Sequence, residues 1–191
     1  MSKQHGRRIG GMMMSCGTAA TLLAIAPQTH AQTWHGASVT TNNFNDGANW
    51  VGGVAPVNNG TANLIFGGTT RLSPVVNVAY DVNSVTFNNT AGAFNISPGT
   101  ILAIRGGGIT NNDLTTQTFS CPITVSASQN WTTASGSLTI NNNVALNANL
   151  TLNAPVGSIT FSGLVTGAGA LTKSGNSSAT IGNSSYSGPR W

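Results

Sequence analysis

Short alternations of apolar and polar residues, separated by turn residues, fill most of the chain beyond its N-terminal region. Residues 136–163 show the pattern as Ser-Leu-Thr-Ile, Asn-Leu-Thr-Leu and Ser-Ile-Thr-Phe, each bounded by Asn, Gly or Pro. Alternation over four or five residues predicts a half-buried strand, and the Asn, Gly and Pro clusters predict turns. The same stretch holds no acid, base, histidine or cysteine, so its pattern indicates a structural role rather than a reactive site.

The predicted strands recur at a nearly constant spacing. One column of equivalent apolar positions has steps of 21, 21 and 20 residues: Phe119, Ile140, Phe161 and Ile181, extended backwards by Val75 and Ile96. A second column is Ile104, Val125, Leu146 and Val165, and a third is Phe66, Phe87, Ile109, Trp131, Leu152 and Thr172. Three strand-like segments repeated at a fixed period are typical of a solenoid, in which stacked coils bury a core that no single coil can bury.

The expected fold class is therefore all-β, as a right-handed parallel β-helix with an N-terminal cap. About five to six coils, at about 4.8 Å per coil, would make a stack roughly 25–30 Å long. Charged residues make up only 5% of the chain and glutamate is absent, which argues against long surface helices. A β-sandwich of short antiparallel strands is the alternative, although a sandwich has no reason to repeat at a constant period.

The first 31 residues have the layout of a secretory signal peptide. Three basic residues (Lys3, Arg7 and Arg8) precede an apolar run, and small residues stand at Thr29 and Ala31. We expect cleavage after Ala31, followed by a cap segment at 32–61 and coils at 62–191. An uncleaved anchor at 9–26, a twin-arginine signal and a lipid on Cys16 are the alternatives.

Signal removal would leave almost no net charge and one cysteine. The remaining ions are Arg71, Arg105, Lys173 and Arg190 against Asp46, Asp81 and Asp113, which gives 4 − 3 = +1. Without a basic patch, nucleic acid is excluded as a partner. Cys121 has no partner for an internal disulfide, and its apolar neighbours predict a small buried hydrophobe.

Several motifs resemble one known class of exported proteins. Residues 45–68 read NDGANWVGGVAPVNNGTANLIFGG, the coils contain SVTF and SITF, and residues 169–188 read GALTKSGNSSATIGNSSYSG. These stretches, which span most of the chain after Ala31, resemble proteins with autotransporter-associated β-strand repeats. The resemblance implies an exported bacterial surface protein with a β-helical passenger. The Tyr-Ser-Gly motif is followed by Pro189 and Arg190 rather than by further coils, and no C-terminal barrel signal follows, so we expect an N-terminal part of such a protein, truncated or natively short.

The titratable residues do not form a recognisable catalytic or metal-binding set. The three Asp residues are separated by 35 and 32 positions, which are not multiples of the coil period, so we expect them on different faces. Asp113 predicts an Asx-turn, and the sequence around Asp46 predicts a turn rather than a calcium loop. His35 has no companion ligand. We therefore nominate no catalytic, cofactor-binding or metal-binding residue, and no cofactor.

Two functional hypotheses of different classes follow. The first is a non-catalytic scaffold or adhesin-like module, located at the cell surface, outside the cell or in the periplasm. Its partners would be surface glycans or other surface proteins, with weak self-association through 178–181 of the last coil and no membrane span after cleavage. The second is a carbohydrate-active β-helix, either a polysaccharide lyase or hydrolase or a glycan-binding relative, with Trp34 or Trp131 stacking on sugars. The position of Trp131 in a core column favours burial for that side chain.

Overall fold

The computed structural model describes residues 30–190 and shows an all-β molecule. Its strands stack as a parallel β-solenoid of about six turns, which confirms the predicted coil architecture over the sandwich. The right hand of the coil stays a prediction. The strands are β1 (His30–Trp34), β2 (Ala62–Gly68), β3 (Tyr80–Ala91), β4 (Asn95–Ile96), β5 (Leu102–Asn111), β6 (Gln117–Phe119), β7 (Ile123–Val125), β8 (Gln129–Thr133), β9 (Leu138–Ile140), β10 (Val144–Leu146), β11 (Leu150–Asn153), β12 (Ile159–Gly167), β13 (Leu171–Ser174) and β14 (Ala179–Tyr186). A short 3-10 helix, η1 (Gly47–Asn49), lies between β1 and β2.

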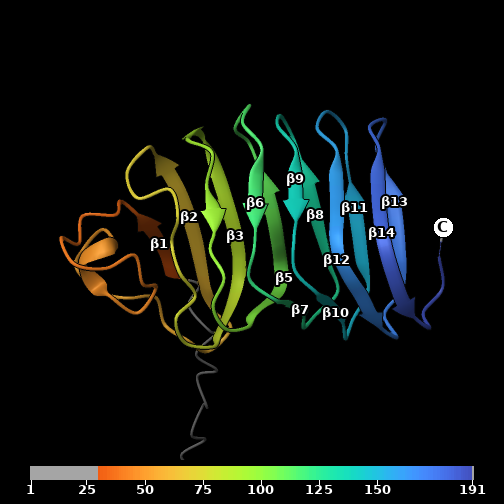
Figure 1. Cartoon of the computed structure of the whole chain (residues 1–191), viewed down its shortest axis with the longest axis horizontal. Helices are drawn as coiled ribbons and strands as arrows, with labels where there is room; N and C mark the ends of the chain where they lie inside the picture. Colours follow the sequence, from red (N-terminus) through yellow and green to blue (C-terminus); the bar gives the residue numbers. More distant parts are fainter. Residues whose placement is uncertain (1–29, 191) are drawn as a thin grey trace, which may run out of the picture.

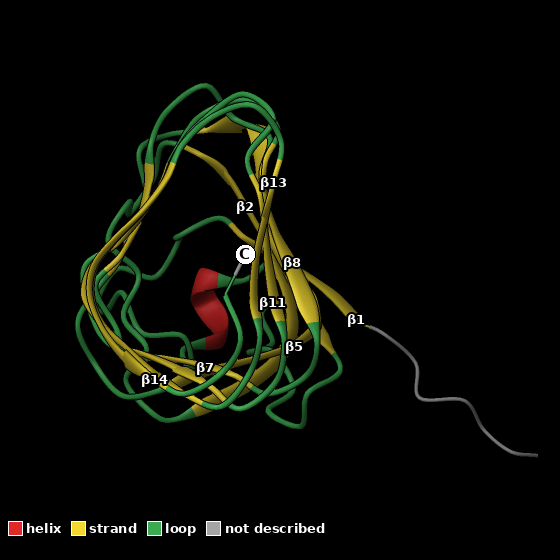
Figure 2. Cartoon of the chain, turned by 90° about the vertical axis from the view of Figure 1, so that its right-hand side faces the viewer, coloured by secondary structure: helices red, strands yellow, loops and turns green. Residues whose placement is uncertain are grey.

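The coils fold over three faces, so the stack has a rounded triangular outline when seen along its axis (Figure 2). Face 1 contains β1, β2, the second halves of β3 and β5, β8, β11 and β13. Face 2 contains the first halves of β3 and β5, β7, β10 and the second halves of β12 and β14. Face 3 contains β4, β6, β9 and the first halves of β12 and β14. All these pairs are parallel, and successive coils lie side by side along the long axis (Figure 1).

Alternation along each strand sends apolar side chains inward and polar ones outward. On face 3 the pairings Phe119–Ile140, Ile140–Phe161 and Phe161–Ile181 are all direct, which confirms the first predicted column. Its first three members are fully buried, and Ile181 in the last coil is partly buried. Ile96 pairs with Phe119 and extends the column, whereas Val75 pairs with Ser97 and does not belong to it.

The second predicted column is correct only in part. Ile104, Val125 and Leu146 are paired in succession, but the partner of Leu146 is Gly167 rather than Val165. Val165 pairs instead with Val144. Each face 2 strand has two inward positions separated by one outward residue, so an apolar residue in the next coil can belong to either row.

The third predicted column contains two further errors. Phe87 pairs with Asn111 rather than Ile109, because the register between β3 and β5 shifts between Val82 and Ser84. Leu152 pairs with Lys173 rather than Thr172, which puts a lysine at an inward register position of the last coil. The Phe66–Phe87, Ile109–Trp131 and Trp131–Leu152 steps are confirmed.

An aromatic cluster closes the N-terminal end of the core. Trp34 and Trp50 meet edge to face at a centroid distance of 5.1 Å, and Phe44 lies 5.6 Å from Trp50. The indole N–H of Trp50 donates to the Phe44 carbonyl over 2.7 Å. Phe66, which also contacts Trp34, continues this packing into the first coils.

The irregular segment between β1 and β2 holds η1 and supplies this closure (Figure 1). Within the part of the chain that the structure describes, no helix is long and apolar enough to cross a membrane.

Candidate functional site

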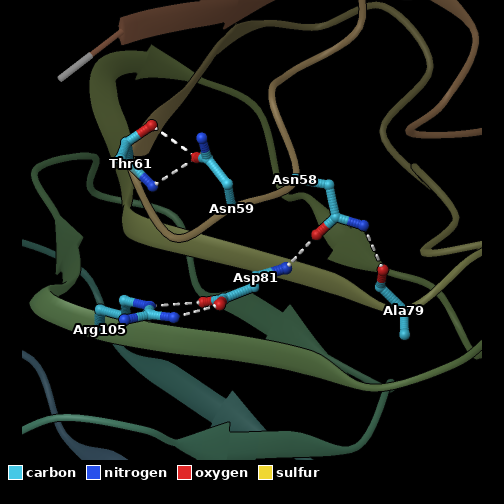
Figure 3. Close-up of polar contacts among 6 residues, drawn as sticks. All are labelled: Asn58, Asn59, Thr61, Ala79, Asp81 and Arg105. Atoms are coloured by element: carbon cyan, nitrogen blue, oxygen red, sulfur yellow. Dashed lines mark hydrogen bonds and ion pairs between the residues drawn. The ribbon is translucent and has the colours of Figure 1, made fainter. Parts of the chain in front are cut away.

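A cluster of polar side chains gathers where the N-terminal segment joins the coils (Figure 3). Asp81 of β3 and Arg105 of β5 face each other across adjacent coils. The Arg105 Nε lies 2.9 Å from Asp81 Oδ1, and Arg105 Nη2 lies 2.6 Å from Asp81 Oδ2. The two side chains are 31% and 49% exposed, for Asp81 and Arg105 respectively, so solvent screens the pair and its contribution to stability is small.

Asn58 ties the incoming chain to the start of β3. Its Nδ2 donates to the Ala79 carbonyl over 2.7 Å, and its Oδ1 accepts from the Asp81 N–H over 2.7 Å (Figure 3). The Gly60 N–H donates to the Asp81 carbonyl over 2.8 Å. In the described part of the chain, no strand of an earlier coil pairs with this part of β3, and the amide of Asn58 satisfies its backbone instead.

Gly60 allows the Arg105 side chain to lie directly against the backbone of the cap segment. Its φ is +81°, and a Cβ at this position would lie 2.0 Å from the Arg105 Nε. The next residues form a local turn, because Asn59 Oδ1 accepts from both the N–H and the hydroxyl of Thr61 (Figure 3). The geometry of this cluster is that of a structural fastening between cap and coils, since its polar atoms bond to backbone or to each other.

Asp46 forms another structural hydrogen-bond cluster, which lies inside the cap. It is the N-cap of η1, and its Oδ1 accepts from the Ala48 N–H over 3.1 Å. Its Oδ2 accepts from the hydroxyls of Ser38 (2.6 Å) and Thr41 (2.7 Å). The Ser38 and Thr41 hydrogen bonds, followed by that of Ala48, hold the pKa of this carboxyl below its usual range. The predicted turn is confirmed, and both carboxylate oxygens already accept hydrogen bonds from the chain.

Asp113 forms the Asx-turn that the sequence predicts. Its Oδ1 accepts from the Thr115 N–H over 2.8 Å and from the Thr115 hydroxyl over 2.7 Å, while its own N–H donates to Asn111 Oδ1. No hydrogen bond joins Asp46, Asp81 or Asp113 to another of the three in residues 30–190. Each of the three acids therefore bonds to a different part of the chain.

The single thiol and the histidines of the described chain do not assemble into a site. Cys121 is buried, and burial raises the pKa of its thiol to about 12, so it stays protonated at neutral pH. This confirms the prediction of a small buried hydrophobe. His35 is exposed, and residues 30–190 contain no group of three His, Cys, Asp or Glu side chains that could hold a metal ion.

The tryptophans considered for sugar stacking lie inside the molecule. Trp131 is fully buried, stacks on Phe161 at 5.6 Å and donates its indole N–H to Gln129, which confirms its predicted place in the core. Trp34 is only 1% exposed. Neither ring has a free face for a sugar in this structure.

Buried amides were missed by the sequence analysis. Asn49 Nδ2 donates to the carbonyls of Thr41 and Asn43, and its Oδ1 accepts from the Ser38 N–H. Gln117 similarly bonds to the backbone of Gly92 and Phe94 at an irregular corner. Gln129 Nε2 donates to the Ile104 carbonyl. A scan for apolar periodicity cannot find such residues, because they are identified by the main-chain groups that lie beside them in three dimensions.

Uncharged side chains form the outer surface of face 3. One row follows the middle residues of its strands: Asn95, Thr118, Thr139, Thr160 and Thr180. Hydrogen bonds from polar side chains also run along the stack, as from Asn142 Nδ2 to the Ser120 carbonyl. Asn149 also bonds to the backbone of the neighbouring coil, since its Oδ1 accepts from the Ala170 N–H.

Comparison with known proteins identifies no relative of this chain: no family model, no curated protein and no solved structure matches it. The solenoid is compatible with a β-helical repeat protein, and membership of the autotransporter-associated class stays a prediction.

Proposed function

We propose that the protein is a non-catalytic scaffold or adhesin-like module of the autotransporter-associated β-helical type, exported to the cell surface, the extracellular space or the periplasm. The observation that supports this most is the use made of the acids. Asp46, Asp81 and Asp113 are engaged respectively in a helix cap, an ion pair and an Asx-turn. A glycoside hydrolase of the usual kind would need two carboxylates roughly 5–10 Å apart, free to reach a substrate.

The stack itself supports a mechanical role. Parallel coils share backbone hydrogen bonds on three faces and a continuous apolar core, so the molecule resists bending between coils. Its outer rows carry threonine and asparagine, which offer hydrogen bonds to surface glycans or surface proteins. In this proposal the solenoid is a stiff spacer, and its solvent-exposed faces contact the glycans or proteins.

Turnover of polysaccharides tests the proposal. The purified protein is incubated with pectin, alginate and neutral glycans, with and without calcium, and new reducing or unsaturated ends are measured. We expect none with the wild type. Turnover that is lost in Asp46→Asn, Asp81→Asn or Asp113→Asn, but kept in the surface control Thr139→Ser, would contradict the scaffold and favour the carbohydrate-active alternative.

Export is tested separately by the mass of the secreted protein. The predicted signal at 1–31 lies outside the described residues except for His30 and Ala31, which pair with Ala62 and Asn63 in β1. Cleavage after Ala31 leaves Gln32, Thr33 and Trp34 to pair with β2. We expect the exported protein to begin at Gln32, and an intact Met1 or a lipid on Cys16 would contradict this.

A further inference from the structure

Three columns of outward residues form a regular array on face 3. The middle column is Thr118, Thr139, Thr160 and Thr180, and its pairings from coil to coil are all direct. Each coil adds one residue two positions before its threonine and one two positions after it: Thr116 and Ser120, Ser137 and Asn141, Ser158 and Ser162, and Ser178 and Gly182. We call these positions the face 3 array, and none of them is buried.

The backbone fixes the spacing of this array in two directions. Neighbouring coils lie about 4.8 Å apart, and outward residues of one strand are separated by two residues, or about 6.6 Å. The branched side chain of threonine is stiff, so its hydroxyl and methyl groups keep their positions. In the outer columns, the hydroxyls of Ser137 and Ser158 lie 3.2 Å apart, and the Ser120 hydroxyl donates to Asn95 Oδ1 over 2.8 Å. The polar groups therefore form a lattice that is set by the fold.

The chemistry of the face 3 array narrows the kind of partner that it fits. The segments 116–120, 137–141, 158–162 and 178–182 contain no charged residue and no histidine, so the partner is neutral. Within residues 30–190, the hydroxyls of Thr118, Thr139 and Thr160 form no hydrogen bond with the chain and are free to bind water.

The aromatic residues argue against a sugar as this partner. Every Trp, Tyr and Phe side chain within residues 30–190 is buried, so the described surface offers no ring on which a sugar could stack. What remains for recognition is a set of evenly spaced hydroxyl and methyl groups. A partner that is itself a regular lattice of hydrogen-bonding groups matches such a set.

We propose that the face 3 array binds the surface of ice. Water molecules in ice repeat along each row at a distance close to the coil spacing, so hydroxyls of successive coils hold water in positions that continue the crystal. Each contact is weak, but the rigid fold presents all of them together, so their contributions add with little further loss of entropy. Liquid water has no such repeat. This activity goes beyond the proposed scaffold role and rests on the face 3 array alone.

The other two faces lack an equivalent array. On face 2 the corresponding outward row reads Asp81, Ala103, Thr124, Ala145 and Thr166, in which alanine alternates with threonine. On face 1 a row of three threonines lies between Ile65 and Asn153, and Gly108 leaves a gap in the column beside it. Face 2 therefore provides a matched control position, Thr124, which is outward and partly exposed like Thr139.

Slow freezing of a dilute solution tests the proposal. The purified protein is mixed with an inert soluble protein of similar size, an ice crystal is grown slowly, and both proteins are measured in the ice and in the remaining liquid. We expect the wild type to be enriched in the ice relative to the inert protein. Thr139→Tyr places a large ring between Thr118 and Thr160, and its ice fraction should fall to that of the inert protein. Thr160→Tyr should have the same effect one coil further along.

Thr124→Tyr makes the same substitution on face 2 and should keep the ice fraction of the wild type. The unfolding midpoint of each variant checks that it remains folded. A wild type that is excluded from ice like the inert protein would overturn the proposal, as would equal ice fractions in Thr139→Tyr and Thr124→Tyr. Binding to insoluble cellulose that is lost in Thr139→Tyr, by a protein that ice excludes, would assign the array to a neutral glycan instead.

Discussion

Single polar residues in this molecule act mainly by satisfying the backbone where the coil is irregular. Asn49, Gln117 and Gln129 are almost completely buried, and each bonds to main-chain groups beside irregular parts of the coil. Leaving such a group unpaired costs about 1–3 kcal/mol, so each of these amides contributes to the stability of the fold. Their hydrogen-bonding groups are therefore engaged within the fold.

Cys121 should behave as an inert core residue. Its thiol is buried, with its pKa raised to about 12, so almost no thiolate is present at neutral pH. In a Cys16→Ser background, we expect iodoacetamide to label Cys121 only after denaturation. A Ser126→Cys control, at an exposed position, should react at once. Rapid native labelling of Cys121 would show that the coil around it opens.

Asp46 should make the stability of the cap depend on acid pH. Its pKa is lowered in the folded state, so its contribution is complete at neutral pH, begins to fall near pH 4, and is lost as the pH falls through the lowered value. We expect Asp46→Asn to flatten the decline of stability below about pH 4. The measurement is the denaturant midpoint of both proteins as a function of pH. Parallel curves for the two proteins would exclude this role.

At the level of elements, the sequence predicts which segments form strands better than it predicts their register. Apart from Val75, the face 3 column was predicted correctly because its strands repeat a conspicuous Thr followed by Ile or Phe. The face 1 column failed between Phe87 and Ile109, where the glycine-rich corner 105–108 lengthens the coil and the register shifts. Counting apolar residues cannot place such a corner, because its position is set by backbone bonding between coils.

Glycine at that corner is required by the neighbouring coil and not only by its dihedral angle. Gly108 and Gly68 both have positive φ, of 65° and 71°, and a left-handed residue other than glycine costs roughly 1–2 kcal/mol. A Cβ on Gly108 would lie 2.0 Å from the Asn130 carbonyl oxygen, whereas a Cβ on Gly68 meets nothing within 4 Å.

We therefore expect Gly108→Ala to lower the free energy of unfolding clearly more than Gly68→Ala does. Denaturant titration of the two variants measures the difference. Equal losses would mean that β5 and β8 do not approach each other as closely as described.

At the level of the whole molecule, each coil is stabilised mainly by the coils on either side. A solenoid behaves as a row of units with nearest-neighbour interfaces, so damage to a middle coil uncouples both halves. The period of about 21 residues already predicts this organisation, since it places equivalent residues of successive coils in contact. The sequence predicts the cap at 32–61, but not the hydrogen-bond network that holds its aromatic cluster, such as the bond from the Trp50 indole N–H to the Phe44 carbonyl.

The 21-residue repeat builds a continuous inward column through the stack. Ile140 and Thr139 are neighbours in β9, but Ile140 is 0% exposed and points inward, while Thr139 belongs to the outward row. The direct test is to compare Ile140→Asp with Thr139→Asp by denaturant titration. We predict that Ile140→Asp loses several kcal/mol, because it buries an unpaired charge between two coils, while Thr139→Asp loses about 0.5 kcal/mol or less. Equal, small losses in both variants would place Ile140 at the surface and contradict the stacked core.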